Sequence, residues 1–490
     1  MTEKEHRKGF RLFSRFSRNK TSIAAAATST GAMGVSGTVS QSQNSAAMSR
    51  NLEQASIRLQ EYIETQEEND DMPPDVTSMS RWIKKSEKFS NSSYSSYGDD
   101  SFLREAAIPA SHRKLIDLAA VSSKRVYVNP GAPLVFLKPE RFQAIGLEEN
   151  LSPDLFFGTV KAMHVRLFGV DLENNGRLTP VIVVSIRGTA SVRDWSVNFN
   201  HSSNNHIQAG DFLGETPERG AYRVHSGYLE SARQSISALE EAILRQVLDR
   251  AITNFSQPPQ LLFTGHSAGG AVASILYAHV SRGFQSGLSA TQNLYSKKGS
   301  HSSSVLEKLH SKFSSIHLVT FGAPPVTSPS IPLPSINSST SSRAACYAII
   351  NEGDPIPRAD DAYIDALLRL FVYVPPPSPA SNYSNAPSNA LSSLGAHLSS
   401  MQIVDDTKTK LKYDLPKPQL RNAGQVLLLC KPDPKRLASD LPVFWNVPTQ
   451  GAQGALEEML FANPAMHHML KYLERLGLVQ VKRPGGGSLT

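Results

Sequence analysis

Residues 261–270 read Leu-Leu-Phe-Thr-Gly-His-Ser-Ala-Gly-Gly. A short apolar run, 261–263, precedes a Gly-x-Ser-x-Gly motif, and a run of small residues typical of a packed helix follows it. A strand, a sharp turn and a helix in this order form a nucleophile elbow, which exposes its central serine above the sheet. We therefore predict that Ser267 is a nucleophile. The competing interpretation is a glycine-rich turn capped by Ser267.

The residue types around Ser267 suit this chemistry. Gly265 and Gly269 leave room for the strand and the helix to approach each other around a strained turn. The N-terminus of the following helix favours negative charge that develops at the turn. We expect the backbone N–H of Ala268 to be one donor to an oxyanion.

Strands and helices alternate on both sides of the motif. Short apolar or β-branched runs predict strands at 164–170, 181–186, 261–263, 316–321, 345–350 and 425–429. Helical spacing or composition predicts helices at 115–120, 228–250 and 271–280. This alternation predicts an α/β domain with a mostly parallel central sheet and helices on both faces.

Composition divides the chain into three parts. Residues 1–103 are a low-complexity region with a basic start, expected to be mostly disordered apart from one helix near 51–67. Residues 104–480 are the predicted α/β domain, and 481–490 are a flexible tail. Ser-rich or Ser/Pro-rich inserts near 284–305, 328–343 and 375–405 are expected to be surface loops of the domain.

A serine nucleophile needs a base, and the base needs an acid to orient it. In this kind of fold the acid follows the serine in the chain and the histidine comes last. Asp354 follows the predicted strand 345–350, which places it at the sheet edge that carries the elbow. Asp360, Asp361 and Asp365, on a predicted helix, are weaker alternatives.

The base is the less determined member. His467 and His468 follow the last predicted strand, and on a helix two adjacent side chains point about 100° apart, so only one is expected to face Ser267. His397 lies in a Ser-rich insert, where it would be hard to hold rigidly. His225, His266 and His317 come before or between the required elements. The adjacent histidines lack the cysteine or carboxylate cluster of a metal site, and no metal is predicted.

Charge is concentrated at the N-terminus. Seven basic residues stand against two acidic ones in residues 1–20, and aromatic residues are interleaved with them. This basic segment is open to three interpretations: a disordered tail, a membrane-surface anchor or a mitochondrial transit segment. The rest of the chain is close to neutral and carries no nucleic-acid-binding motif, so no nucleic-acid partner is expected.

Other features of the chain bear on its compartment. We find no signal peptide, no run of about 18 apolar residues, and only two cysteines, Cys346 and Cys430. We therefore expect an intracellular protein, cytoplasmic or peripherally membrane-associated, rather than a secreted one.

Several motifs together resemble those of the fungal-type class 3 lipases, α/β-hydrolases that include the diacylglycerol lipases. The resemblance covers roughly 110–480, and its order and spacing are highly specific. Five segments carry it: Val184-Ser185-Ile186-Arg187-Gly188-Thr189 with Asp194-Trp195, Val224 to Tyr228, Thr264 to Gly270, Thr320-Phe321-Gly322-Ala323-Pro324, and Asn351 to Pro357.

The resemblance implies a role for each matching residue. Ser267 is the nucleophile, Asp354 the acid, and Thr189 the second oxyanion donor beside Ala268. The family's histidine is commonly followed by an apolar residue at +2 and a tyrosine at +5. His467, with Met469 and Tyr472, fits that register, and His468 is the alternative. The segment 195–224 corresponds to the family's lid, but it is more polar here than a strongly amphipathic lid.

The resemblance implies a serine-dependent lipase of the intracellular branch that hydrolyses mono-, di- or triacylglycerols through an acyl-enzyme, without a cofactor. The alternatives are a phospholipase A1, a feruloyl-type esterase acting on soluble esters, and a lipase-like interaction protein that has lost catalysis. The basic N-terminus is expected to contact a membrane or lipid-droplet surface.

Overall fold

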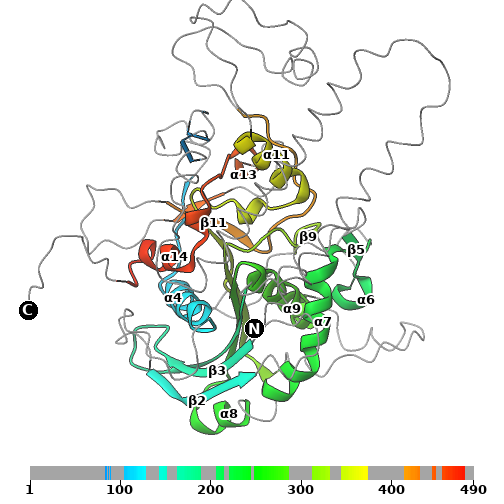
Figure 1. Cartoon of the computed structure of the whole chain (residues 1–490). Coiled ribbons are helices and arrows are strands. Elements are labelled where there is room, and N and C mark those ends of the chain that lie inside the picture. Colours follow the sequence, from blue (N-terminus) through cyan, green and yellow to red (C-terminus); the bar gives the residue numbers. More distant parts are fainter. Residues whose placement is uncertain are drawn as a thin grey trace, which may run out of the picture. The chain divides into compact units, whose positions relative to one another are not determined.

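The structure is a computed structural model, and the part of it described here lies in the compact unit Arg58–Thr490 (Figure 1). Apart from a few residues between 83 and 89, the described residues are 104–127, 143–151, 163–188, 206–214, 220–243, 248–285, 312–331, 344–372, 413–430, 444–447 and 455–479. The predicted helix near 51–67 and most of the three predicted inserts lie outside these ranges, as does nearly all of 1–103.

Within the described ranges, nine strands form one sheet in the order β1-β12-β11-β10-β8-β7-β4-β3-β2. Their bounds are β1 Arg104–Glu105, β2 Gln143–Leu151, β3 Met163–Val170, β4 Thr179–Ile186, β7 Gln260–His266, β8 Ser315–Phe321, β10 Cys346–Asn351, β11 Gln425–Leu429 and β12 Phe444–Asn446. A smaller sheet joins β5 His206–Gln208, β6 Arg223–His225 and β9 Thr327–Ser328.

The described helices and 3-10 turns connect these strands. Their bounds are α4 Ala110–Arg125, α6 Gly210–Leu213, α7 Ser226–Glu241, α8 Asp249–Asn254, α9 Ala268–Gln285, η7 Ile356–Arg358, α11 Asp361–Val372, α13 Ala455–Glu458, η8 Pro464–His467 and α14 Met469–Arg475.

The middle of the large sheet is parallel and its edges are antiparallel. Strands β4, β7, β8, β10 and β11 pair in parallel. The pairs β2–β3 and β3–β4 at one edge, and β11–β12 and β1–β12 at the other, are antiparallel. Because parallel strands end at the same edge, the segments that follow β7, β8 and β10 come together there.

Helices cover both faces of the sheet, as Figure 1 shows with α4 and α14 on one side and α7 and α9 on the other. Alternate residues of a strand point to opposite faces. Val181 and Val183 of β4 therefore pack in the cluster that contains residues of α4 and α14. Ile182 and Val184 pack in the cluster under α7 and α9. The predicted mostly parallel α/β fold with helices on both faces, the α/β-hydrolase fold, is confirmed.

The helix predicted over 228–250 contains α7, which ends at Glu241, and α8, which begins at Asp249; 242–243 and 248 are π-helical, and 244–247 lie outside the described residues. The predicted helix 115–120 is longer, since α4 runs from Ala110 to Arg125. Among the described helices, none is long and apolar enough to cross a membrane.

Candidate active site

The Gly-x-Ser-x-Gly motif is folded as an elbow between β7 and α9. Ser267 follows the last strand residue, His266, and precedes the first helix residue, Ala268. Its backbone has a φ of 57°, a left-handed conformation that costs a non-glycine residue energy. The Ser267 N–H donates to the carbonyl of Phe321 in β8, 2.9 Å away, and this bond ties the elbow to the neighbouring strand.

The two motif glycines are required by close backbone contacts. A Cβ on Gly265 would lie 2.5 Å from the carbonyl carbon of Gly269, so β7 and α9 approach too closely there for any side chain. A Cβ on Gly269 would lie 2.7 Å from the carbonyl carbon of Arg187, at the end of β4. The glycines thus allow three segments, the end of β7, the start of α9 and the end of β4, to meet around Ser267.

Asp354 lies in the loop after β10 and is fully buried. The backbone N–H of Ile356 donates to its Oδ1 at 2.9 Å, which fixes the carboxylate in the loop. Two of the three other candidate acids serve elsewhere: Asp360 accepts from the N–H of Tyr363 in the first turn of α11, and Asp365 pairs with Arg369 on the surface. The side chain of Asp361 lies outside what the structure describes.

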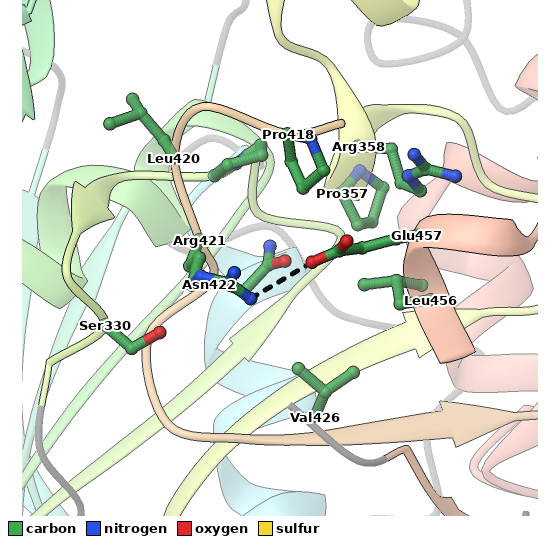
Figure 2. A pocket seen from close by; sticks show the side chains of 11 residues that line it. Ser330, Pro357, Arg358, Pro418, Leu420, Arg421, Asn422, Val426, Leu456 and Glu457 are labelled. Carbon is green, nitrogen blue, oxygen red and sulfur yellow. Dashed lines mark hydrogen bonds and ion pairs between the residues drawn. The ribbon is translucent and has the colours of Figure 1, made fainter. Parts of the chain in front are cut away.

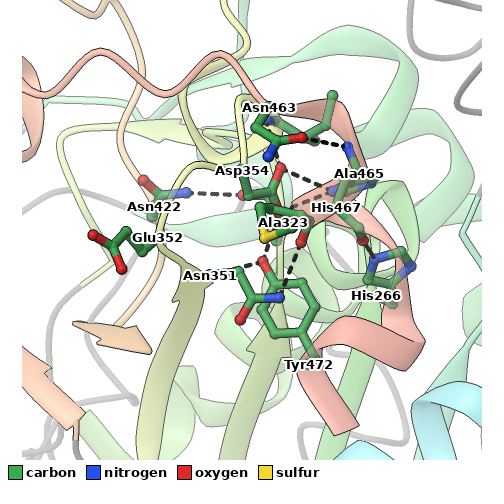
Figure 3. Close-up of polar contacts among 12 residues, drawn as sticks. His266, Ala323, Asn351, Glu352, Asp354, Asn422, Asn463, Ala465, His467 and Tyr472 are labelled. Carbon is green, nitrogen blue, oxygen red and sulfur yellow. Dashed lines mark hydrogen bonds and ion pairs between the residues drawn. The ribbon is translucent and has the colours of Figure 1, made fainter. Parts of the chain in front are cut away.

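His467 is the histidine that reaches Asp354. Its Nδ1 lies 3.0 Å from Oδ2 and 3.1 Å from Oδ1 of Asp354, and both side chains are buried (Figure 3). Because a carboxylate only accepts, Nδ1 carries a proton, and in the neutral imidazole the lone pair is then on Nε2. His468 instead lines a small void together with Lys124, Tyr127, His266 and Met469.

The prediction that His467 and His468 share a helix is wrong. His467 ends the 3-10 turn η8, and His468 is an extended residue, with φ −61° and ψ 131°, that precedes α14. Because of this break between η8 and α14, the side chains of His467 and His468 point in different directions.

Contacts outside the candidate triad of Ser267, Asp354 and His467 hold the base and the acid together. The Asn351 side chain donates to the carbonyl of Met466 at 2.9 Å, and the Asn463 N–H donates to the carbonyl of Gly353 at 2.9 Å. Arg475 of α14 donates to the carbonyl of Leu429 at 2.7 Å. The segment that carries His467 is therefore tied to the ends of β10 and β11.

Tyr472 also contacts the acid. Its hydroxyl donates to Oδ2 of Asp354 at 2.6 Å and accepts the N–H of Asn351 at 3.0 Å (Figure 3). In the sequence, Tyr472 stood out only by its register with His467. Asn351 and Arg475 were not predicted as site residues, and only their contacts with segments distant along the chain reveal their roles.

Ser267 and His467 both lie against the segment in which β8 ends. Gly322 follows Phe321, which bonds to the Ser267 N–H, and a Cβ on Gly322 would lie 3.0 Å from Nδ1 of His467. Within the described part of the chain, Nε2 of His467 is buried and makes no hydrogen bond. A buried nitrogen with a lone pair beside a nucleophile elbow is suited to accept a proton from a serine hydroxyl.

Of the two predicted oxyanion donors, only Ala268 is described. It begins α9, where the first backbone N–H groups have no acceptor within the helix, and it is buried. Thr189 lies outside the described residues. Gly188, directly before it, donates its N–H to the hydroxyl of Tyr127 at 2.9 Å.

Part of the segment predicted as a lid, 195–224, is described. Phe212 and Leu213 of α6 are buried in the cluster under α7 and α9. The ring of Phe212 stacks on His279 of α9 at 4.1 Å, and Nδ1 of His279 is 2.8 Å from the carbonyl of Phe212. This part of the segment is therefore packed on α9.

A separate hollow lies beside the acid loop, bounded by Pro357, Leu420, Leu456 and an ion pair of Arg421 with Glu457 (Figure 2). The described residues of its lining include no histidine, and their one carboxylate, Glu457, is paired with Arg421. Among the described residues, no group of three or more His, Cys, Asp or Glu is arranged to hold a metal ion.

Residues 183–363 match the family model for class 3 lipases. The matched range contains Ser267 and Asp354, whereas His467 lies beyond it and is placed by its contact with Asp354. No curated protein matches the chain.

The chain is similar to several solved structures of fungal lipases. The Rhizomucor miehei lipase in complex with its propeptide is 17% identical, with 77% of this chain and 83% of that chain covered and a TM-score of 0.34. A lipase from Rhizopus microsporus var. chinensis is 14% identical (75% and 88% covered, TM-score 0.35). The Lip2 lipase from Yarrowia lipolytica is 16% identical (53% and 78% covered, TM-score 0.31).

Proposed function

We propose, from the match of residues 183–363 to the class 3 lipase family model, that the protein is a lipase-type hydrolase. We propose further that it cleaves acylglycerol esters through an acyl-enzyme on Ser267. The observation that carries the proposal is the buried contact of 3.0 Å between His467 and Asp354, which leaves Nε2 of His467 as the free base beside the elbow.

The proposed reaction has two halves. Nε2 of His467 takes the proton of the Ser267 hydroxyl as its oxygen attacks the ester carbonyl, and Asp354 stabilises the imidazolium. The N–H of Ala268 and the predicted donor Thr189 bind the oxyanion, and each such donor lowers the barrier by about 2.7–4 kcal/mol. His467 then protonates the leaving alcohol, and water hydrolyses the acyl-enzyme by the same route.

The nucleophile is tested with a fluorophosphonate probe and p-nitrophenyl esters. Ser267→Ala is expected to abolish both labelling and hydrolysis while the protein remains folded. Ser274→Ala is the matched control, because Ser274 is a buried serine of α9, the helix that Ser267 precedes, and its hydroxyl donates to the carbonyl of Gly270, 2.8 Å away. Labelling that persists in Ser267→Ala would rule out Ser267 as the nucleophile. A wild-type chain without Ser267-dependent turnover would favour the non-catalytic interaction protein.

The substrate class is tested with a panel of esters. We expect the highest kcat/KM on mono-, di- or triacylglycerols, compared with phospholipids and short soluble esters under identical conditions. Faster cleavage of phospholipids would identify a phospholipase A1, and faster cleavage of feruloyl or short-chain esters would identify a soluble-ester esterase. The polar composition of 195–224 is the feature that favours the last alternative.

We also propose that the protein is intracellular and that its basic N-terminus binds an anionic lipid surface, because basic and aromatic residues alternate in 7–20. Removal of residues 1–50 is expected to lower recovery on anionic vesicles without changing hydrolysis of soluble esters. Unchanged recovery would contradict this role of the N-terminus.

A further inference from the structure

A series of hydrogen bonds connects Gly188 with His467 through the elbow residue His266. None of these bonds is among those proposed for Ser267, Asp354 and His467 in catalysis. The N–H of Gly188 contacts the hydroxyl of Tyr127 at 2.9 Å. That hydroxyl lies 3.2 Å from Nδ1 of His266, and Nε2 of His266 lies 2.6 Å from the carbonyl of His467. This series of hydrogen bonds thus begins at Gly188, the residue before Thr189, and ends at His467, the proposed base.

The direction of each bond follows from the two ends. A carbonyl only accepts, so Nε2 of His266 carries the proton and Nδ1 has the lone pair. Tyr127 therefore donates its hydroxyl proton to Nδ1 and accepts the N–H of Gly188. Burial, more than any neighbouring charge, lowers the pKa of His266 well below 6.5, and the nearby His467 acts in the same direction. His266 is thus neutral, as this arrangement requires.

The residues that form these hydrogen bonds are closely packed. A Cβ on Gly188 would collide with the hydroxyl of Tyr127 and would lie 2.6 Å from the carbonyl oxygen of His266. The rings of His266 and His467 are 4.6 Å apart, and His266 is fully buried. Tyr127 follows α4, so the chain also connects the first described helix of the domain to the elbow.

We propose that Tyr127 and His266 are positioning residues, which fix the Gly188 peptide relative to the backbone of His467. This inference rests on the proposed function. As a consequence, Gly188, the elbow and the segment that carries His467 keep fixed positions relative to one another during catalysis. Since oxyanion donors act on the transition state more than on bound substrate, losing this alignment should lower kcat with little effect on KM.

The test is Tyr127→Phe, which removes only the hydroxyl. We expect kcat and the rate of fluorophosphonate labelling to fall by about tenfold, because small misplacements of catalytic groups have effects of this order or larger, with KM changed less than twofold. Tyr413→Phe is the matched control: it removes a tyrosine hydroxyl that donates to the carbonyl of Ala366 at 2.9 Å, on α11. The control should keep kcat at the wild-type value.

A double-mutant cycle separates positioning from general destabilisation. His266→Gln keeps a donor near the position of Nε2 and removes the acceptor at Nδ1. Because both substitutions break one chain, Tyr127→Phe with His266→Gln should lower kcat about as much as the more damaging single variant. Losses that multiply would overturn the inference.

Other outcomes also decide the inference. Retention of wild-type kcat by Tyr127→Phe would overturn it, and so would a loss accompanied by a raised KM and a Tm well below that of Tyr413→Phe. These results are read only against a wild-type chain with Ser267-dependent turnover. Failure of the proposed function is therefore seen separately, as absence of that turnover.

Discussion

Tyr472 donates a 2.6 Å hydrogen bond to Oδ2 of Asp354, the carboxylate oxygen that also lies nearest to the proposed base. Asp354 thus receives donors from three directions, namely His467, Tyr472 and the N–H of Ile356. A carboxylate held by three donors is restrained from rotating, so it sets the orientation of the buried His467.

We predict that Tyr472→Phe lowers both stability and kcat. The buried oxygen of Asp354 and the N–H of Asn351 each lose a partner, which costs about 1–3 kcal/mol of the free energy of unfolding. Looser orientation of His467 should reduce kcat by about tenfold. Urea unfolding and ester hydrolysis measure the two effects.

Tyr363→Phe is the matched control for this variant. The Tyr363 hydroxyl is equally buried, donates to the carbonyl of Phe461 at 2.7 Å and accepts the N–H of Phe461 at 2.9 Å, without contacting the triad. It should lower stability by a similar amount and leave kcat unchanged. Equal losses of kcat in both variants would show that Tyr472 acts only through stability.

We predict that His467→Asn and His468→Asn separate the base from its neighbour. His467→Asn removes the proton acceptor and should lower kcat by about 10⁴-fold or more. His468 does not contact Asp354, so His468→Asn should keep kcat within a few-fold. Steady-state hydrolysis of a p-nitrophenyl ester distinguishes them, and the opposite ranking would assign the base to His468.

We predict that Gly322→Ala disables the site. Gly322 has a φ of 58°, and a Cβ there would lie 2.8 Å from Oδ2 of Asp354 and 2.9 Å from the hydroxyl of Tyr472. The substitution carries about 1–2 kcal/mol of backbone strain and also displaces the acid. Thermal unfolding and kcat should both fall.

Gly477→Ala is the control for backbone strain alone. Gly477 has a φ of 68°, but a Cβ there would meet no atom within 4 Å. This variant should lose stability comparably and keep kcat. Normal kcat in Gly322→Ala would mean that the acid tolerates displacement.

We predict that stability decreases as the pH falls below 6.5. Burial lowers the pKa of His317 to about 3, and burial followed by the charge of Arg166 lowers that of His164 to about 4. Below pH 6.5, His164 and His317 bind protons in the unfolded chain, whereas in the folded chain they stay neutral until the pH approaches their lowered pKa values. The stabilisation is complete above 6.5 and is lost towards about 4 for His164 and about 3 for His317.

Each histidine contributes a slope of up to about 1.4 kcal/mol per pH unit. Urea unfolding between pH 7 and 5, where most carboxylates remain ionised, measures this slope. His317→Gln should reduce the slope by one proton, although it also weakens the bond from the N–H of Ala345 to Nδ1 of His317. A free energy of unfolding independent of pH in this range would contradict the prediction.

The sequence alone determined the elbow and the sheet around it. A short apolar strand, a glycine-flanked serine and a small-residue helix are local patterns, since each depends on neighbours within a few residues. The alternation of such segments was sufficient to predict the parallel sheet, and the order of motifs placed Asp354 at the edge that carries the elbow.

Only the tertiary structure decided which side chains meet there. Asp354 and His467 are 113 residues apart, and Tyr127 and His266 are 139 apart, so no local pattern relates them. His467 and His468 are adjacent and chemically identical, and the break between η8 and α14 directs only His467 to Asp354. Side-chain direction depends on backbone geometry and on packing between distant segments. The sequence therefore ranked His467 above His468 only by its register with Met469 and Tyr472, whereas the fold shows which of the two contacts Asp354.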